Sequence, residues 1–414
     1  MTYNLLSKTL CQLHEELYSN CHPRSLKWST RCAALLREIE SLDLDIYCFQ
    51  ELDEDDYTDQ FEPKLRKLGY TGFYQRRTGD RNDGCALFYR SQKVQAVLIR
   101  GVEFNQNRFI GRDNVGIVAI LEVTQGQSKK KVCVATTHIL FNPRRGMVKI
   151  AQLKMLLESA QLLIEEQDED IPLVLCGDMN ASPNSFVLHY LQSQDVDATM
   201  QMEVVMSQKL FDGQAARPSG TYPNGITEFN ASFRNIRQAL AAVLGTTYRP
   251  PPELQLQQEH LHTPSDVLTL MANMHIPPGT PQQQQQHHHH HLHHHLRHQH
   301  HQKKHDPSSN RVSQPFQLQS AYEYHTHIPG RQKMYKQWTT YHTASKEMCD
   351  FIMYGHLWPT TTTIAPLPSQ QTPSRLEVLA TLVLPCRELD KCHGLPIRYF
   401  GSDHLSLAAV FRFA

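Results

Sequence analysis

The segment that most constrains the fold runs from Pro172 to Asn180 and reads Pro-Leu-Val-Leu-Cys-Gly-Asp-Met-Asn. Its apolar residues 173–176 are typical of a short strand that is buried on both faces, and Gly177 allows the backbone to turn after them. Asp178 and Asn180 would then lie at the end of the strand. There the carboxylate could hold a metal-bound or attacking water, and the amide could donate to a phosphate oxygen. The alternative is an Asx-turn that closes the strand, and the tripeptide by itself favours that alternative.

The composition limits the class of protein. The 414 residues suffice for one large α/β domain with insertions or for two to three average domains. Because 41 basic residues balance 41 acidic ones, any nucleic-acid surface must be local. The ten cysteines form no Cys-x-x-Cys pair and no zinc-ligand spacing, so we expect reduced, structural thiols in an intracellular protein.

No apolar run approaches the roughly 20 residues of a membrane span, and the first residues have no signal-peptide pattern. We therefore expect a soluble protein of the cytoplasm or nucleus that has no membrane partner. The chain begins directly on an apparent strand, Met1-Thr-Tyr-Asn4-Leu-Leu, and this abrupt start predicts that an N-terminal segment is missing.

Strand and helix patterns alternate along the chain, which indicates an α/β fold. Helical spacing of apolar residues predicts helices from Ser29 to Leu42 and, amphipathic, from about Ile150 to Leu163. Buried or alternating strands are predicted over 45–49, 85–89, 115–123, 132–137, 348–354 and 405–413.

Residues 245–314 do not follow these patterns. They contain a run of glutamines at 282–286 and a histidine-rich tract from His287 to His305, and such a composition cannot form a core. We predict a low-complexity, disordered insertion in a single domain made of residues 1–244 and 315–414. The tract could be a metal store, but repeated histidines without fixed geometry bind many metals weakly, so an expanded loop is the favoured interpretation.

Polar residues recur at the predicted strand ends. Each could be structural by itself, as a turn cap, an ion-pair partner or a hydrogen-bonded histidine. Eight of them in one chain indicate a site: Asn4, Glu51, His138, Asp178, Asn180, Asp350, Asp403 and His404.

The segments that hold these residues resemble, in the same order, the motifs of the endonuclease/exonuclease/phosphatase superfamily. They are Tyr3-Asn-Leu-Leu6, Cys48-Phe-Gln-Glu51, Thr137-His-Ile139, Gly177-Asp-Met-Asn180, Cys349-Asp-Phe-Ile352 and Ser402-Asp-His-Leu405. Within it, the chain is similar to the deadenylase-like branch that includes nocturnin, and to its Angel-type members, through Asp83–Leu87, Arg112–Val115 and Phe141–Gln152. The resemblance covers residues 1 to about 195 and 316–414.

The resemblance implies a four-layer α/β sandwich, in which two packed β-sheets are flanked by helices, with a metal-dependent phosphodiesterase site at one edge. Glu51 would hold Mg²⁺, or Mn²⁺, and Asn4 would orient Glu51. Asp403 would contribute to the metal environment through water. Asp178 would position or deprotonate the attacking water, while Asn180 donates to the phosphate.

The resemblance also implies phosphate-binding groups. His404 would bind the phosphate, held in its tautomer by a hydrogen bond to Asp350, and His138 would be a further phosphate donor. Arg144, Arg145 and Lys149 would form a local basic strip for substrate, although a solvated helix start explains them equally well.

The resemblance implies an enzyme acting on RNA 3′ ends. The first candidate is a poly(A)-removing 3′ exoribonuclease, as the wider branch implies, and the second is an RNA 2′,3′-cyclic phosphatase, an activity associated with Angel-type proteins. Both reactions attack a phosphorus beside a 3′ oxygen, so the sequence does not separate them. The rival class is a non-catalytic RNA- or translation-factor-binding protein, which would be recognised by loss of Glu51, Asp178 or His404, and all three are present. The expected partner is single-stranded RNA rather than DNA, and translation or mRNA-decay factors are further candidates.

Overall fold

The computed structural model describes residues 1–106, 110–143, 145–197, 311–322, 325–327, 334–358 and 375–414. All of these described residues belong to one compact unit. The predicted disordered insertion lies outside the described residues as far as residue 310. The domain has resumed by β10 (Arg311–Ser313), before the predicted boundary of 315, because this strand pairs with β9 (Asp195–Asp197) and buries Val312.

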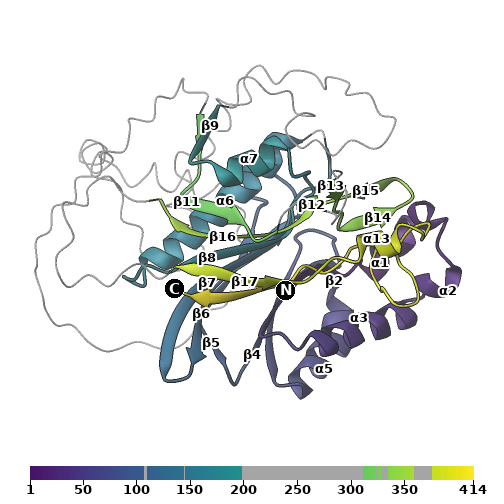
Figure 1. Cartoon of the computed structure of the whole chain (residues 1–414), viewed down its shortest axis with the longest axis horizontal. Helices are drawn as coiled ribbons and strands as arrows, with labels where there is room; N and C mark the ends of the chain where they lie inside the picture. Colours follow the sequence, from purple (N-terminus) through teal and green to yellow (C-terminus); the bar gives the residue numbers. More distant parts are fainter. Residues whose placement is uncertain (107–109, 144, 198–310, 323–324, 328–333, 359–374) are drawn as a thin grey trace, which may run out of the picture. The chain divides into compact units, whose positions relative to one another are not determined.

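Two sheets form the centre of the described fold (Figure 1). The four-stranded sheet has the order β1 (Thr2–Asn4), β2 (Ile46–Asp53), β4 (Asp83–Arg90) and β3 (Tyr70–Arg76). The six-stranded sheet has the order β11 (Phe316–Ser320), β16 (Asp350–Leu357), β8 (Leu173–Asp178), β7 (Ser128–His138), β6 (Val115–Gln125) and β5 (Val94–Glu103). Only β1–β2 and β7–β8 are parallel neighbours within these two sheets.

The side chains of β2 show how the layers pack. Tyr47 and Phe49 point outward and join Leu35 and Ile39 of α3 (Trp28–Leu42) in one apolar cluster. Cys48, which points the other way, belongs to the larger core of the six-stranded sheet. This alternation buries one strand face under helices and the other under a sheet. Helix α5 (Glu62–Lys67) covers the same outer face, while α6 (Gly146–Glu165) and α7 (Phe186–Gln192) cover the six-stranded sheet, so the predicted four-layer sandwich is confirmed.

Helix α6 differs from the amphipathic helix that the sequence predicts. Its polar residues Lys149, Gln152 and Ser159 are fully buried together with its apolar ones. The reason is that the helix is covered on more than one side. One side packs on the sheet, and Lys154 at another side donates to the carbonyl of Ser313 in β10 at 3.0 Å.

The C-terminal segment is a strand only in part. The predicted alternation over 405–413 holds for β18 (Ala409–Phe413), which pairs with β17 (Leu376–Thr381), but residues 405–408 are all buried. Leu407 forms a bridge to Thr2 of β1, and His404, just before these residues, forms one to Thr340 of β14 (Thr340–His342). The segment that precedes β18 is therefore placed next to the first strand of the chain.

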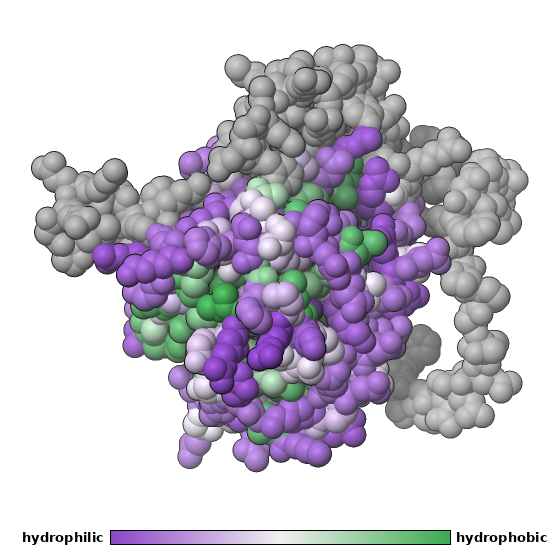
Figure 2. Space-filling model, turned by 90° about the vertical axis from the view of Figure 1, so that its right-hand side faces the viewer, coloured by the Kyte–Doolittle hydropathy of each residue, from purple (hydrophilic) through white to green (hydrophobic). Residues whose placement is uncertain are grey.

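Smaller elements connect these parts. They are α1 (Lys8–Leu13), a 3-10 turn (Glu15–Tyr18), α2 (Pro23–Leu26), α4 (Glu54–Asp56), a π turn (Tyr57–Phe61), β12 (His325–His327), β13 (Met334–Lys336), β15 (Ser345–Glu347) and α13 (Cys386–Leu389). Hydrophilic residues predominate on the face in Figure 2, where hydrophobic residues form separate smaller areas. Among the described helices, none is long and apolar enough to cross a membrane. All ten cysteines are free, as the sequence predicts.

Candidate active site

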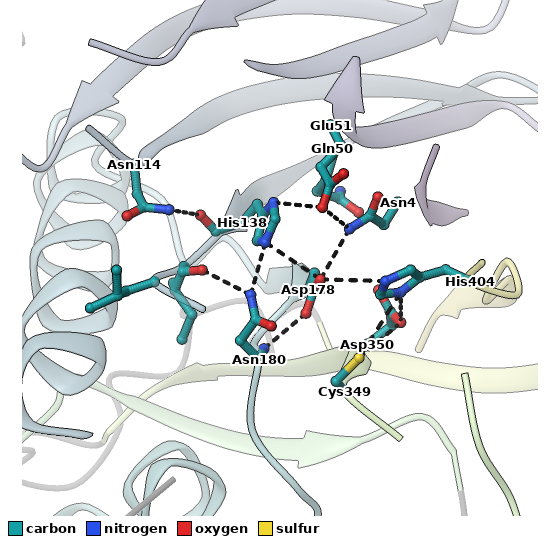
Figure 3. Close-up of polar contacts among 12 residues, drawn as sticks. Asn4, Gln50, Glu51, Asn114, His138, Asp178, Asn180, Cys349, Asp350 and His404 are labelled. Carbon is teal, nitrogen blue, oxygen red and sulfur yellow. Dashed lines mark hydrogen bonds and ion pairs between the residues drawn. The ribbon is translucent and has the colours of Figure 1, made fainter. Parts of the chain in front are cut away.

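Strand register brings the predicted residues together. Asp178 ends β8, with His138 of β7 as its register partner on one side and Asp350 of β16 on the other. In the second sheet Asn4 is the partner of Gln50, which Glu51 follows. Figure 3 shows the side chains of these strand ends converging on Asp178.

Gly177 has a different role from the predicted turn, because β8 continues through it to Asp178. Its φ is +139°, and a Cβ at this position would lie 2.0 Å from the carbonyl oxygen of Thr137. Only glycine allows this close approach of β8 to β7 in that conformation. The glycine thus sets the position of Asp178 relative to His138.

Glu51 lies at an irregularity of β2 rather than at its end. The register of β2 with β4 shifts between Phe49 and Leu52, and Glu51 has a φ of +52°. Such a bulge re-aims a side chain. The amide of Asn4 donates to Oε1 of Glu51 at 2.9 Å and the Ser7 backbone N–H to Oε2 at 3.2 Å, so the predicted contact between Asn4 and Glu51 is confirmed.

Asp178 is the central carboxylate and is only 2% exposed. Its Oδ2 accepts a hydrogen bond of 3.0 Å from the Asn4 amide, and its Oδ1 accepts one of 2.9 Å from the Asn180 backbone N–H. The same Oδ2 lies 3.5 Å from Nε2 of His138 and 3.9 Å from Nε2 of His404. One carboxylate oxygen is therefore surrounded by two imidazoles and by the amide that also binds Glu51.

Asn180 orients His138. Its side-chain amide donates to the carbonyl of Ile139 at 3.0 Å and contacts Nε2 of His138 at 2.8 Å. Since both amide hydrogens are used in this way, Nε2 of His138 accepts and the imidazole proton lies on Nδ1. This buried Nδ1 has no hydrogen-bond partner within the described part of the chain, and it faces Oε1 of Glu51 at 3.7 Å. In this arrangement His138, not Asn180, has a free donor in the site.

The predicted hydrogen bond between Asp350 and His404 is confirmed, with 2.8 Å between Oδ2 and Nδ1. Burial lowers the pKa of His404, but the carboxylates of Asp350 and Asp403 outweigh burial and hold the pKa well above its ordinary value. The imidazole is therefore charged at neutral pH, and its Nε2–H points toward Asp178. Cys349, whose Sγ lies 4.0 Å from Nδ1, completes the surroundings.

The predictions for the remaining substrate and metal residues fare differently from one another. Asp403 accepts a hydrogen bond from the hydroxyl of Tyr18 at 3.2 Å and lies 3.9 Å from Nε2 of His404, so its metal role stays a prediction. Arg144 lies outside the described residues, and Arg145 is half-buried where α6 begins. The prediction that Lys149 contacts substrate is wrong, because Lys149 is fully buried and its Nζ donates to the carbonyl of Asn180 at 2.6 Å.

The residues fit a divalent metal ion. Potential ligand atoms of Glu51, His138 and Asp178 all lie within 4.8 Å of one another. The two carboxylates supply the hard oxygen donors that Mg²⁺ and Mn²⁺ prefer. Since Nδ1 of His138 carries its proton and Nε2 accepts from Asn180, the metal-binding atoms of this group are the carboxylate oxygens.

The sequence analysis did not identify the residues whose side chains bind the backbone of Asn4 and His138. The Ser402 hydroxyl donates to the backbone carbonyl of Asn4 at 2.6 Å, and Asn114 donates to the backbone carbonyl of His138 at 3.0 Å. Gln152 in turn donates to Asn114 at 3.2 Å. A polar side chain at an otherwise apolar helix position, as at Gln152, is the one sequence signal that could have indicated such a contact.

Comparison with known proteins identifies relatives of the sequence. The profile of the Endonuclease/Exonuclease/phosphatase family matches residues 1–404. Protein angel homolog 1 of Rattus norvegicus is 41% identical over 204 residues, which are 47% of this chain and 31% of the relative. Protein angel homolog 2 of Danio rerio is 37% identical over 201 residues, 48% of this chain and 35% of the relative. The matched region thus spans about a third of the length of these relatives.

A solved structure extends the comparison to the whole fold. The crystal structure of ANGEL2, described as a 2′,3′-cyclic phosphatase in complex with adenosine-2′,3′-vanadate, matches with a TM-score of 0.67 and 26% sequence identity. The match covers 100% of this chain and 94% of that chain.

Proposed function

The chain belongs to the Endonuclease/Exonuclease/phosphatase family, and from this premise we propose that it is a phosphoric-ester hydrolase, specifically an RNA 2′,3′-cyclic phosphatase that requires Mg²⁺. Mn²⁺ is the alternative metal. The observation that carries the proposal is the position of Asp178, whose Oδ2 lies within 4 Å of both imidazoles while the Asn4 amide links it to Glu51.

Asp178 and the residues around it have different roles in hydrolysis. Asp178 takes the proton of the attacking water, because it is an acceptor-only carboxylate that a backbone N–H and an amide hold in place. The charged His404 donates from Nε2 to a phosphoryl oxygen, and Asp350 maintains that orientation. The Nδ1–H of His138, which has no hydrogen-bond partner among the described residues and faces Oε1 of Glu51 at 3.7 Å, supplies a second donor.

A bound metal ion would be held by the carboxylates of Glu51 and Asp178 and would supply charge neutralisation at the phosphoryl oxygens. Asn4 bridges the two carboxylates and fixes their orientation, since its one amide nitrogen donates to both. This shared donor offsets part of the repulsion between the two negative charges.

The similarity to ANGEL2 supports the cyclic phosphatase over the exonuclease. That protein is described as a 2′,3′-cyclic phosphatase, and the likeness extends over the whole of this chain. The resemblance to the deadenylase-like branch put the poly(A)-removing 3′ exoribonuclease first, and the same residues could serve it, so the exonuclease stays the second candidate. RNA as substrate, and translation or mRNA-decay factors as partners, stay proposals.

Two labelled RNAs test the proposal, one ending in a 2′,3′-cyclic phosphate and one ending in oligo(A) with a 3′-hydroxyl. We expect the purified protein with Mg²⁺ to convert only the first, with no shortening of the chain, and to lose the activity in EDTA. Stepwise shortening of the oligo(A) RNA, with the cyclic phosphate left intact, would replace the proposal with the exonuclease.

A further inference from the structure

Arg31 of α3 is a buried cation next to the candidate active site. It is 1% exposed, and its Nη1 donates to the backbone carbonyls of Leu5 at 3.2 Å, Leu6 at 2.7 Å and Gly401 at 3.2 Å. Its Nε has no hydrogen-bond partner within the described residues, and no carboxylate of these residues forms an ion pair with it. A buried charge without a counter-ion is costly, so its carbonyl contacts are its main compensation.

The three carbonyls belong to the two segments that hold the site. Leu5 and Leu6 follow Asn4, and Gly401 begins the loop that contains His404. Leu6 has a φ of +55°, which is unfavourable for a leucine and has to be held by its surroundings. Its carbonyl accepts from Arg31, and its N–H donates to Oδ1 of Asn4 at 3.0 Å.

Ser402 connects the two segments directly. Its hydroxyl donates to the backbone carbonyl of Asn4 at 2.6 Å and accepts from the backbone N–H of His404 at 3.1 Å. A displacement of Gly401 would therefore move Ser402 and change the distance between Asn4 and His404. Asn4 aims Glu51 and Asp178, so the same displacement would separate His404 from both carboxylates.

Gly401 packs against α3 at the same place. A Cβ on Gly401 would lie 2.5 Å from the carbonyl oxygen of Arg31 and 2.8 Å from Cγ of Leu35. The approach is thus possible only without a side chain. The hydrogen bond from Arg31 holds Gly401 against α3, and the lack of a side chain at Gly401 permits this close approach. Together they keep the segment from Gly401 to His404 packed on the helix.

We propose that Arg31 is a positioning residue for the hydrolysis: it holds the turn after Asn4 and the loop before His404 at a fixed separation, so that His404 and the Glu51–Asp178 carboxylates face one phosphoryl group. This inference rests on the proposed function for its kinetic test. Arg31 does not touch substrate, so its loss should lower kcat and leave KM nearly unchanged.

The test compares Arg31→Met with Arg90→Met, a control that also removes a largely buried arginine but at the end of β4. Arg90 is also largely buried and donates to Asp45 at 3.1 Å, but it lies at the opposite end of β2 and β4 from Glu51. A displacement of about 1 Å costs about 10²-fold in rate. We expect kcat of Arg31→Met on the cyclic-phosphate RNA to fall about 10²-fold, that of Arg90→Met to stay near wild type, and Arg31→Lys to recover part of the loss.

Gly401→Ala provides an independent variant should Arg31→Met fail to fold. It should lower kcat as Arg31→Met does, and the double variant should be no slower than the slower single one, because both changes release the same loop. A lowered melting temperature with wild-type kcat in Arg31→Met and Gly401→Ala would show that the contact is only structural and would overturn the inference.

Amide hydrogen exchange separates this inference from the proposed function. We expect faster exchange in residues 1–7 and 399–407 of Arg31→Met and not of Arg90→Met, whether or not the wild-type protein hydrolyses the RNA. Unchanged exchange in both segments would overturn the inference, whereas an inactive wild type with the expected exchange pattern would overturn only the proposed function.

Discussion

Replacing Lys149 with methionine should impair catalysis far more than stability. The ammonium of Lys149 is fully buried and donates to the carbonyl of Asn180 at 2.6 Å, and Asn180 has a φ of +46°. This charge-assisted hydrogen bond therefore helps to hold the backbone of Asn180 in the left-handed region, which residues other than glycine adopt at a cost in free energy. Methionine keeps the length and apolar volume of the side chain but cannot donate.

Two opposing terms set the size of the effect on stability. Loss of a hydrogen bond to a charged donor costs about 1.5–3 kcal/mol. Release of Asn180 from its left-handed conformation regains about 1 kcal/mol, the low end of the range for such strain, because asparagine tolerates this region better than other non-glycine residues. The net change is on the order of 1 kcal/mol, or about 2–4 °C in melting temperature for a domain of this size. Asn180 would no longer hold His138, and a misplacement of about 1 Å lowers the rate about 10²-fold.

Single-turnover hydrolysis of the cyclic-phosphate RNA, measured beside thermal unfolding, tests this reasoning. Lys154→Met is the matched control, because Lys154 lies in the same helix and donates to Glu158 at 2.9 Å and to the carbonyl of Ser313 at 3.0 Å, away from the site. The control should keep the wild-type rate. A Lys149→Met protein that loses several kcal/mol of stability but retains its rate would refute the proposed link through Asn180.

Three further predictions concern the site itself. Glu51→Ala should remove hydrolysis at limiting Mg²⁺ while the melting temperature stays within a few degrees, and wild-type turnover at limiting metal, measured by metal titration, would contradict the metal role. His404→Ala should abolish most of the rate, and adding Asp350→Asn should cost little more; single-turnover rates that show multiplicative defects would mean that the pair does not act as a unit. Burial lowers the pKa of His404, but Asp350 and Asp403 raise it by more, so the folded-state pKa lies above the unfolded one. The charged imidazole therefore stabilises the fold fully below about pH 6.5, the unfolded-state pKa. This stabilisation is lost as the pH rises through the folded-state pKa. Urea unfolding should therefore show a steeper loss of stability toward alkaline pH in the wild type than in His404→Gln, and parallel curves would exclude a raised pKa.

The sequence predicted much of the site because its signal was local. A polar residue directly after an apolar strand is unusual, and strand ends of neighbouring strands meet at one edge of a sheet. Asp350 and His404, 54 positions apart, could be paired on that basis together with the family resemblance. The α/β class followed from the alternation of strands and helices, and the four-layer sandwich followed from the family resemblance.

Other features depend on packing that no local pattern reveals. Lys149 looks like a solvated residue at the start of a helix, and its burial depends on what covers the second side of α6. Arg31 looks like an exposed basic residue in α3, and its carbonyl partners lie in both terminal segments. The bulge at Glu51 and the engaged amide of Asn180 arise from the register of paired strands, which the sequence of one strand does not specify.

The most direct test of the account is single-turnover hydrolysis of the cyclic-phosphate RNA by the wild type and by Asp178→Asn at saturating Mg²⁺. Asparagine keeps the shape of the side chain and can still accept from the Asn180 N–H, but it cannot take a proton from water. The account predicts that the variant folds as the wild type does and that its rate falls about 10²- to 10⁴-fold, the contribution of a positioned general base. Equal rates for the two proteins would contradict the assignment of Asp178 as the centre of the active site.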